Sequence, residues 1–293
     1  MVIMNYLSTS QKVQVVKCLC EGMSIRGTSR LTGAAKNTII SLLLDMGDAC
    51  AWLHDRKMRN VKARRLQLDE IWEFIGAKQK NASPEKKAEG WGDVWTWTAI
   101  DPESKLCVSY LVGDRDGRAA ADFVWDVRLR VVGRPQITTD VLKAYPGAIE
   151  EAFGANVDYA QLHKIFGASS EPETRYSPPK CIGCDMKTVM GNPDPEHVST
   201  SHVERQNLTM RMSMRRFTRL TNAFSKKVEN HAAAVALYFA FYNFCRVHQT
   251  LRVTPAMEAK LTDHVWDVEE LVALLPAPQA KKRGPYRKRL EVK

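Results

Sequence analysis

The sequence predicts an α/β protein, in which a mixed five-stranded sheet with helices follows an all-α module. Over the first fifty residues, apolar side chains recur at intervals of three and four, the spacing of helices. From Leu66 onward the interval changes to two, the spacing of a strand with one buried face. The later segments alternate between strands and helices, which indicates one mixed sheet covered by helices.

The N-terminal module, residues 1–60 with a basic linker at its end, is predicted to contain three helices. Ser8 and Gln11 form a capping box at the start of the first helix, and Ser24 can cap the second. A tight turn at Gly33 leads into the third helix. The first turn of that helix exposes small and hydrogen-bonding side chains, as the recognition helix of a helix-turn-helix module does, at Lys36, Asn37 and Thr38. We expect these three residues to contact DNA, the alternative being a small helical bundle without a ligand.

The central part, residues 61–248, is predicted to hold the sheet. Its five strands are expected at residues 66–74, 94–101, 105–113, 136–140 and 158–165. Residues 166–198 are rich in Pro, Gly, Ser and charge, and they are expected to form a long loop or insertion. The C-terminal region, residues 249–293, reads as short helices followed by a basic tail.

The charge balance favours a polyanionic partner. The chain of 293 residues has 43 Lys and Arg against 33 Asp and Glu, a net charge of +10. Such an excess favours nucleic acid, and no apolar run is long enough to span a bilayer. The seven cysteines follow no disulfide framework, and the first residues do not resemble a signal peptide. We therefore expect a cytoplasmic, nucleoid-associated protein that is not secreted.

Three carboxylates are predicted to meet in one site. Asp69 falls in the middle of the first strand, Asp140 at the end of the fourth, and Glu204 on a helix after the fifth. Carboxylates are hard ligands that suit Mg²⁺ or Mn²⁺, and two such ions can activate an attacking oxygen and stabilise a leaving one. Because the chain has 33 acidic residues, the placement carries this prediction, not the residue types. Glu70 is expected to point to the opposite face of its strand and is left out.

The segment 199–216 is read as one helix with two faces. One face presents a polar stripe of Glu204, Asn207, Arg211 and Arg215, and the other an apolar stripe of Val203, Met210, Met214 and Phe217. A carboxylate on a DNA-binding face repels phosphate unless a cation lies between them, which again indicates a metal ion. The alternative is an ordinary amphipathic helix with a solvated charged face.

Several segments resemble the DDE transposases of the insertion-sequence-one type. They are LDEIWEFIGAKQKNA, WTWTAIDPESKLCVSYLVGDRD, TTDVLKAY and HVERQNLTMRMSMRRFTRLTNAFSKKVENH, and the similarity covers about residues 60 to 260. The resemblance implies a ribonuclease-H-like domain, metal-dependent DNA cleavage and strand transfer, and action as a homo-oligomer on double-stranded DNA. It places the catalytic, metal-binding triad on Asp69, Asp140 and Glu204. It also implies DNA contacts by Arg205, Asn207 and Arg211.

One departure from this family concerns zinc. Many members carry an N-terminal zinc-binding cysteine pattern, which Cys18, Cys20 and Cys50 do not form, so recognition of transposon ends would fall to the helical module. A different set has the spacing of a small zinc site, namely Cys181, Cys184, His197 and His202. The loop between its two halves lacks the apolar residues that a zinc finger packs inside. Two other functions also remain open: a hydrolytic nuclease of the same fold, and a catalytically silent DNA-binding protein.

Overall fold

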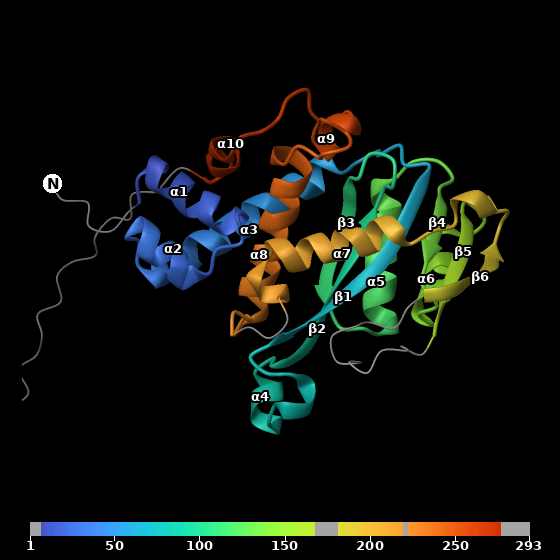
Figure 1. Cartoon of the computed structure of the whole chain (residues 1–293), viewed down its shortest axis with the longest axis horizontal. Coiled ribbons are helices and arrows are strands. Elements are labelled where there is room, and N and C mark those ends of the chain that lie inside the picture. The colour runs from blue at the N-terminus through green and yellow to red at the C-terminus, as the bar shows by residue number, and fades with distance from the viewer. Residues whose placement is uncertain (1–6, 168–180, 219–221, 277–293) are drawn as a thin grey trace, which may run out of the picture.

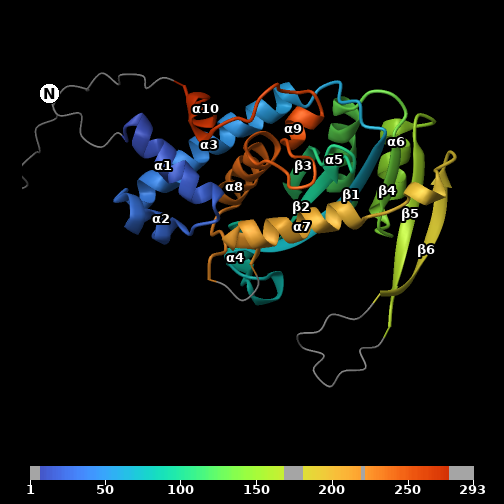
Figure 2. The same ribbon diagram turned by 45° about the horizontal axis from the view of Figure 1, so that its top comes forward.

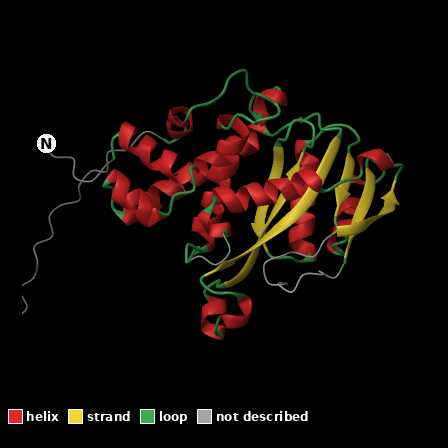
Figure 3. Ribbon diagram, in the orientation of Figure 1, coloured by secondary structure: helices red, strands yellow, loops and turns green. Residues whose placement is uncertain are grey.

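The computed structural model describes residues 7–167, 181–218 and 222–276, which form a helical part beside a single mixed sheet (Figure 1, Figure 3). The six strands are β1 (Arg65–Ile75), β2 (Gly92–Ile100), β3 (Cys107–Gly113), β4 (Gln136–Thr139), β5 (Asp158–Phe166) and β6 (Cys181–Met190). They lie in the order β3-β2-β1-β4-β5-β6. β1 pairs in parallel with β4, and β4 with β5, whereas the other neighbours are antiparallel. The mixed α/β class is therefore confirmed.

The sixth strand corrects the prediction of five. β6 lies inside the segment expected to be a long loop and pairs antiparallel with β5 along the edge of the sheet. None of its side chains is buried and most are exposed, so its sequence shows no alternation of apolar and polar residues. This strand forms through its backbone hydrogen bonds to β5, and no pattern in the sequence indicates those bonds. Residues 168–180 lie outside the described part of the chain.

Three helices begin the described chain, with the predicted caps. They are α1 (Thr9–Cys20), α2 (Ile25–Thr32) and α3 (Lys36–Lys57). Ser8 and Gln11 form the capping box of α1, and the Ser24 hydroxyl accepts a hydrogen bond from the amide of Gly27. Gly33 ends α2 with a left-handed φ of 72°. α3 continues into the segment expected to be a basic linker, and Arg56 lies in its last turn.

The remaining helices of the described chain come after β1. They are α4 (Pro84–Ala88), α5 (Gly117–Arg130), α6 (Ala144–Phe153), α7 (Ser201–Ser213), α8 (Val228–Ala240), α9 (Pro255–Glu258) and α10 (Val268–Ala273). α7 crosses one side of the sheet, and α5 and α6 cover the other (Figure 2). α8 packs along α3 so closely that a Cβ added to Gly47 would lie 2.4 Å from the Cβ of Ala233. α10 returns to α1, where Lys17 and Glu269 form an ion pair of 3.0 Å.

Candidate functional site

The parallel pairing of β1 with β4 brings two of the predicted carboxylates together. The register aligns Gln67 with Thr138, and Asp140 directly follows the last residue of β4. Asp140 therefore lies beside Asp69 at the end of β4, while β1 continues beyond it. Crevices at the carboxyl ends of parallel strands are common places for binding sites. One oxygen each from Asp69, Asp140 and Glu70 lie within 4.8 Å of one another.

The inclusion of Glu70 corrects the expectation that its side chain lies away from the site. Asp69 and Glu70 do point to opposite faces of β1, as strand alternation requires. Asp69 accepts a hydrogen bond from Asn207 on α7, and Glu70 accepts one of 3.0 Å from the Tyr145 hydroxyl on α6. The pairing of β1 with β4 ends at Gln67 and Thr138. The carboxylates of Asp69 and Glu70, from the two faces of β1, therefore both reach the space beyond the end of β4.

Arg115, which the sequence analysis missed, lies between two of these carboxylates. It forms an ion pair of 2.6 Å with Glu70 and approaches Asp140 at 4.0 Å. The residue follows β3 in the segment Gly113–Gly117, where a cation stands between two aspartates. That local pattern was its only signal, and nothing in it indicates which carboxylates the guanidinium reaches.

Crowding and burial disfavour the ionised form of Asp69. Burial is the largest cause, and the neighbouring charge of Glu70 adds to it, so that the pKa of Asp69 rises to about 7. Burial and the charge of Asp140 likewise raise the pKa of Glu70 above its ordinary value. Removal of a carboxylate from water raises its pKa, and proximity to another negative charge raises it further. A divalent cation would offset both effects.

The donor set fits a hard divalent metal ion. Asp69, Glu70 and Asp140 supply carboxylate oxygens, the ligands that Mg²⁺ and Mn²⁺ prefer. Within the described ranges, the buried Oδ1 of Asn207 has no hydrogen-bond partner, although its Nδ2 contacts Asp69. Buried polar atoms without a partner are rare and often mark a place for water or an ion. The cluster could therefore bind a metal ion.

Two side chains of β1 hold α7 across the sheet. The Gln67 Oε1 accepts hydrogen bonds from the backbone amides of His202, at 2.8 Å, and Val203, at 3.1 Å. Two residues further along the same face of β1, Asp69 Oδ2 accepts a hydrogen bond of 2.8 Å from Asn207 Nδ2. The first turn of α7 is thereby fixed relative to the carboxylate cluster. No motif in the sequence indicated this role for Gln67.

Glu204 lies near the cluster but turns toward β5. Its carboxylate forms an ion pair with Lys164 and accepts a hydrogen bond of 2.6 Å from the Thr200 hydroxyl. It precedes Asn207 by three residues, a rise of about 4.5 Å along a helix. The charge of Glu204 contributes to the raised pKa of Asp69, after burial and the nearer carboxylates. The structure thus joins two of the three predicted residues and places the third beside them, held by Lys164.

The predicted DNA-contacting residues fall into two groups. Lys36 and Asn37 are exposed and Thr38 is half-buried at the start of α3, and Arg205 is exposed on α7. Asn207 is buried, and its Nδ2 donates a hydrogen bond to Asp69.

The continuous stripe along residues 199–216 is also a correction. α7 ends at Ser213, and the exposed Arg215 belongs to a following 3₁₀ turn, η3 (Arg215–Phe217). Arg211 remains in the last turn of α7, half-buried, and donates a hydrogen bond of 3.4 Å to the Phe217 carbonyl. The apolar stripe is confirmed, since Val203, Met210, Met214 and Phe217 are all buried.

The alternative zinc set does not assemble. The thiols of Cys181 and Cys184 lie 3.9 Å apart on β6. His202 instead contacts Lys105, and His197 contacts Asp194. In the described part of the chain, the three-carboxylate cluster is the one group of His, Cys, Asp and Glu side chains with the spacing of metal ligands.

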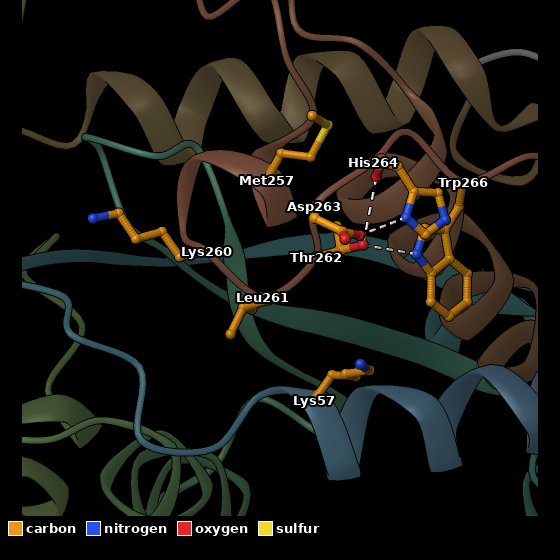
Figure 4. Close-up of a pocket in the computed structure, with 8 residues that line it drawn as sticks. All are labelled: Lys57, Met257, Lys260, Leu261, Thr262, Asp263, His264 and Trp266. Atoms are coloured by element: carbon orange, nitrogen blue, oxygen red, sulfur yellow. Dashed lines mark hydrogen bonds and ion pairs between the residues drawn. The ribbon is translucent and has the colours of Figure 1, made fainter.

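Two surface cavities lie away from the carboxylates. One, of about 510 Å³, lies between the end of α3 at Lys57 and the segment from Met257 to Trp266, where His264 bonds Asp263 (Figure 4). The other, of about 790 Å³, lies between α3 and the chain after α10, and Asn37 and Thr38 are part of its lining. Neither cavity includes a residue of the cluster.

Among the described helices, none combines the length with the apolar character that a membrane crossing requires.

Comparison with known proteins assigns no family to the chain. No family model matches it, and no curated protein is significantly similar to it.

Proposed function

We propose that this protein is a DDE transposase of the insertion-sequence-one type, with a ribonuclease-H-like catalytic domain and a helix-turn-helix module. The observation that carries the proposal is the convergence of Asp69 and Asp140 from two parallel strands beneath α7. The net charge of +10 supports a nucleic-acid substrate. Double-stranded DNA, both as element ends and as target, would be the partner of a homo-oligomer associated with the nucleoid.

In this proposal Asp69 and Asp140 hold Mg²⁺ or Mn²⁺, and Glu204 completes the site. The bound ions would activate the attacking oxygen and stabilise the leaving oxygen of the phosphodiester. Asn207 orients Asp69 through its 2.8 Å hydrogen bond, and Gln67 fixes the helix that carries Glu204. Glu70 and its ion pair with Arg115 position that guanidinium 4.0 Å from Asp140, where it can contact a DNA phosphate.

The DNA itself would meet two separate surfaces. Lys36, Asn37 and Thr38 begin α3, and the exposure of Lys36 and Asn37 suits contact with base edges at the element ends. Arg205, Arg211 and Arg215 lie along and just after α7, where they can contact the backbone near the cleaved bond.

The test is a cleavage and strand-transfer assay on a plasmid that carries the DNA flanking the reading frame. We expect cleavage at the ends and joining to target DNA with Mg²⁺ or Mn²⁺, and loss of both in Asp69→Asn, Asp140→Asn and Glu204→Gln. Asp122→Asn is the matched control, because Asp122 is an exposed carboxylate on α5 outside the cluster.

Two outcomes would favour the alternatives. Metal-dependent cleavage without joining, on any DNA or on RNA–DNA hybrids, would indicate a hydrolytic nuclease. Binding of the element ends without cleavage under any divalent ion would indicate a catalytically silent DNA-binding protein.

A further inference from the structure

Helix α7 and strand β1 run along each other in step, in the layer that contains the carboxylate cluster. Gln67 accepts a hydrogen bond from the amide of Val203, and Asp69 accepts one from Asn207. The two contacts are separated by two strand residues, about 6.6 Å, and by four helix residues, about 6 Å. Gln67, Asp69 and Ile71 therefore lie in a row beneath α7.

Two threonines of β2 lie on the same side of the sheet as this row. The antiparallel register pairs Thr98 with Asp69 and Thr96 with Ile71. Side chains directly opposite each other on paired strands share one face, and their Cβ atoms are about 4.5–5.5 Å apart. α7 also contacts β2, so it covers both strands here. Thr98 thus lies beside a carboxylate of the cluster, whereas Thr96 lies beside an apolar side chain.

Both threonines are buried without a hydrogen bond from the hydroxyl. Thr96 and Thr98 are each 0% exposed, and among the described residues no group forms a hydrogen bond with Oγ1 of either one. A buried hydroxyl without a partner costs free energy, and such atoms are rare in folded proteins. The two positions differ in what lies opposite, because Ile71 has no acceptor to offer and Asp69 has two oxygens.

The Asp69 carboxylate can accept a further hydrogen bond. An ionised carboxylate has about four acceptor positions. Asp69 uses one for the Nδ2 of Asn207 and one for the backbone amide of Glu70. A threonine hydroxyl turns with the χ1 angle of its side chain, between staggered positions. The Thr98 hydroxyl is therefore a donor without an acceptor, next to a carboxylate that has acceptor positions left.

We propose that Thr98 is a positioning residue for the carboxylate cluster, and that its hydroxyl donates a hydrogen bond to Asp69 when the cluster holds a divalent ion. The proposal rests on the metal site of the proposed function. Asn207 holds the carboxylate from the helix above, and Thr98 holds it from the neighbouring strand. Hydrogen bonds to a charged acceptor are stronger than those to a neutral one. Thr98 acts only through Asp69 and does not bind the ion.

The test compares Thr98→Val with Thr96→Val in the full chain, because the two changes remove the same buried hydroxyl from the same face of one strand. Mn²⁺ affinity is measured by electron paramagnetic resonance without DNA. We expect Thr98→Val to lower the affinity about tenfold, as loss of a group that orients a metal ligand does. Thr96→Val should leave the affinity unchanged. The melting temperature of the metal-free protein should rise by about 2 °C in both variants, since a buried hydroxyl without a partner is gone.

Thr98→Ser is the conservative variant, because it keeps the hydroxyl. Its Mn²⁺ affinity should stay near that of the unmodified protein. A second readout is the rise in melting temperature at one fixed concentration of Mg²⁺, which depends on the affinity of the folded protein for the ion. This rise should be smaller in Thr98→Val and unaltered in Thr96→Val. A variant that is more stable without metal and yet binds metal less tightly has lost an orienting contact, since damage to the fold would lower both.

Equal Mn²⁺ affinities in Thr98→Val and Thr96→Val would overturn the role of Thr98 and leave the metal site and the transposase proposal standing. A metal-free Thr98→Val protein that melts below the unmodified one would also overturn it, because the hydroxyl would then have a structural partner. Failure of the unmodified protein to bind Mn²⁺ would overturn the metal site, and the role of Thr98 with it. Mn²⁺ binding that depends on Thr98, in a protein that neither cleaves nor joins DNA, would contradict the transposase proposal alone.

Discussion

Asn207 Nδ2 donates a hydrogen bond of 2.8 Å to Asp69 Oδ2, and this single contact joins the middle of α7 to the middle of β1. The acceptor is a carboxylate whose pKa burial has already raised to about 7. A hydrogen bond to a charged group is worth about 1.5–3 kcal/mol, and loss of the Asn207 donor leaves the Asp69 carboxylate with the backbone amide of Glu70 as its remaining donor.

We therefore expect Asn207→Ala to lower the free energy of unfolding by about 2 kcal/mol at pH 8, as measured by urea denaturation. In the Asp69→Asn background the same change should cost clearly less, since the acceptor of the Asn207 hydrogen bond is no longer charged. Thr209→Ala is a control on the same helix, because its hydroxyl bonds only the Arg205 carbonyl. Equal losses in both backgrounds would show that the hydrogen bond does not stabilise Asp69.

Asp69 and Glu73 should each contribute stability to the metal-free protein that is lost as the pH rises from about 4 to about 7, whereas the buried His54 and His231, whose pKa values burial lowers to about 3, contribute a slope of the opposite sign. Burial, the largest cause, raises the pKa of Glu73 to about 7 even though the Phe74 amide and Arg211 oppose it, and the pKa of Asp69 rises as far. Each group binds its proton more tightly in the folded than in the unfolded chain. The stabilisation that each group contributes is therefore complete below its pKa of about 4 in the unfolded chain. It is lost as the pH rises through the pKa of that group in the folded chain.

Glu73→Gln should remove part of this slope, and saturating Mg²⁺ should remove the part that belongs to Asp69. Mg²⁺ stabilises an ionised ligand but has no such effect on Glu73, which lies outside the carboxylate cluster. The measurement is thermal unfolding from pH 4 to pH 8, with and without Mg²⁺. A slope that Mg²⁺ leaves unaltered in Glu73→Gln would contradict a metal site at Asp69.

Close packing of α3 on α8 should make Gly47→Ala destabilising. Alanine favours a helix over glycine by about 1 kcal/mol, but overpacking costs about 1–3 kcal/mol. A Cβ at Gly47 would lie 2.4 Å from the Cβ and 2.5 Å from the Cα of Ala233, so the two helices would have to move apart. The net loss should appear in urea denaturation.

Gly147→Ala is the matched control for this change. Gly147 is an exposed residue of α6, and a Cβ there meets nothing within 4 Å. The substitution should stabilise the protein by about 0.5–1 kcal/mol through helix propensity alone. If Gly47→Ala stabilised it equally, α3 and α8 would not be packed as described.

The sequence predicted those elements whose signals are local. Ser8 and Ser24 cap the helices assigned to them, and Gly33 has the left-handed conformation that its turn requires. Strands with a buried face were found through alternation, whereas β6, exposed at the sheet edge, has no such pattern. Its formation depends on β5, a partner that only the folded chain provides.

The candidate site divides in the same way. Asp69 and Asp140 could be paired in advance through their predicted placement on two strands of one domain, and the parallel pairing of β1 with β4 brings them together. The presence of Glu70 in the cluster could not be predicted, because its approach to Asp140 depends on where the pairing of β1 with β4 stops. The polar stripe of Glu204, Asn207, Arg211 and Arg215 was predicted to face DNA. Helical spacing alone does not indicate which side of a helix faces the sheet. Asn207 faces the sheet, and Glu204 meets a lysine from β5.

That lysine should lower the affinity of the carboxylate cluster for a metal ion in the absence of DNA. Lys164 neutralises Glu204 and, with the Thr200 hydroxyl, holds it away from Asp69 and Asp140. Lys164→Met should free the carboxylate, and one more negative charge at about 4 Å is worth about 1 kcal/mol even at the dielectric constant of water. We expect the Mn²⁺ affinity, measured by electron paramagnetic resonance, to rise about fivefold. Glu204→Gln in the same background should reverse the gain. Lys187→Met, on the exposed edge strand β6, should leave the affinity unchanged because Lys187 contacts no carboxylate of the described site. An affinity unaltered by Lys164→Met would mean that Glu204 does not reach the ion in the absence of DNA, and that its ion pair with Lys164 is structural.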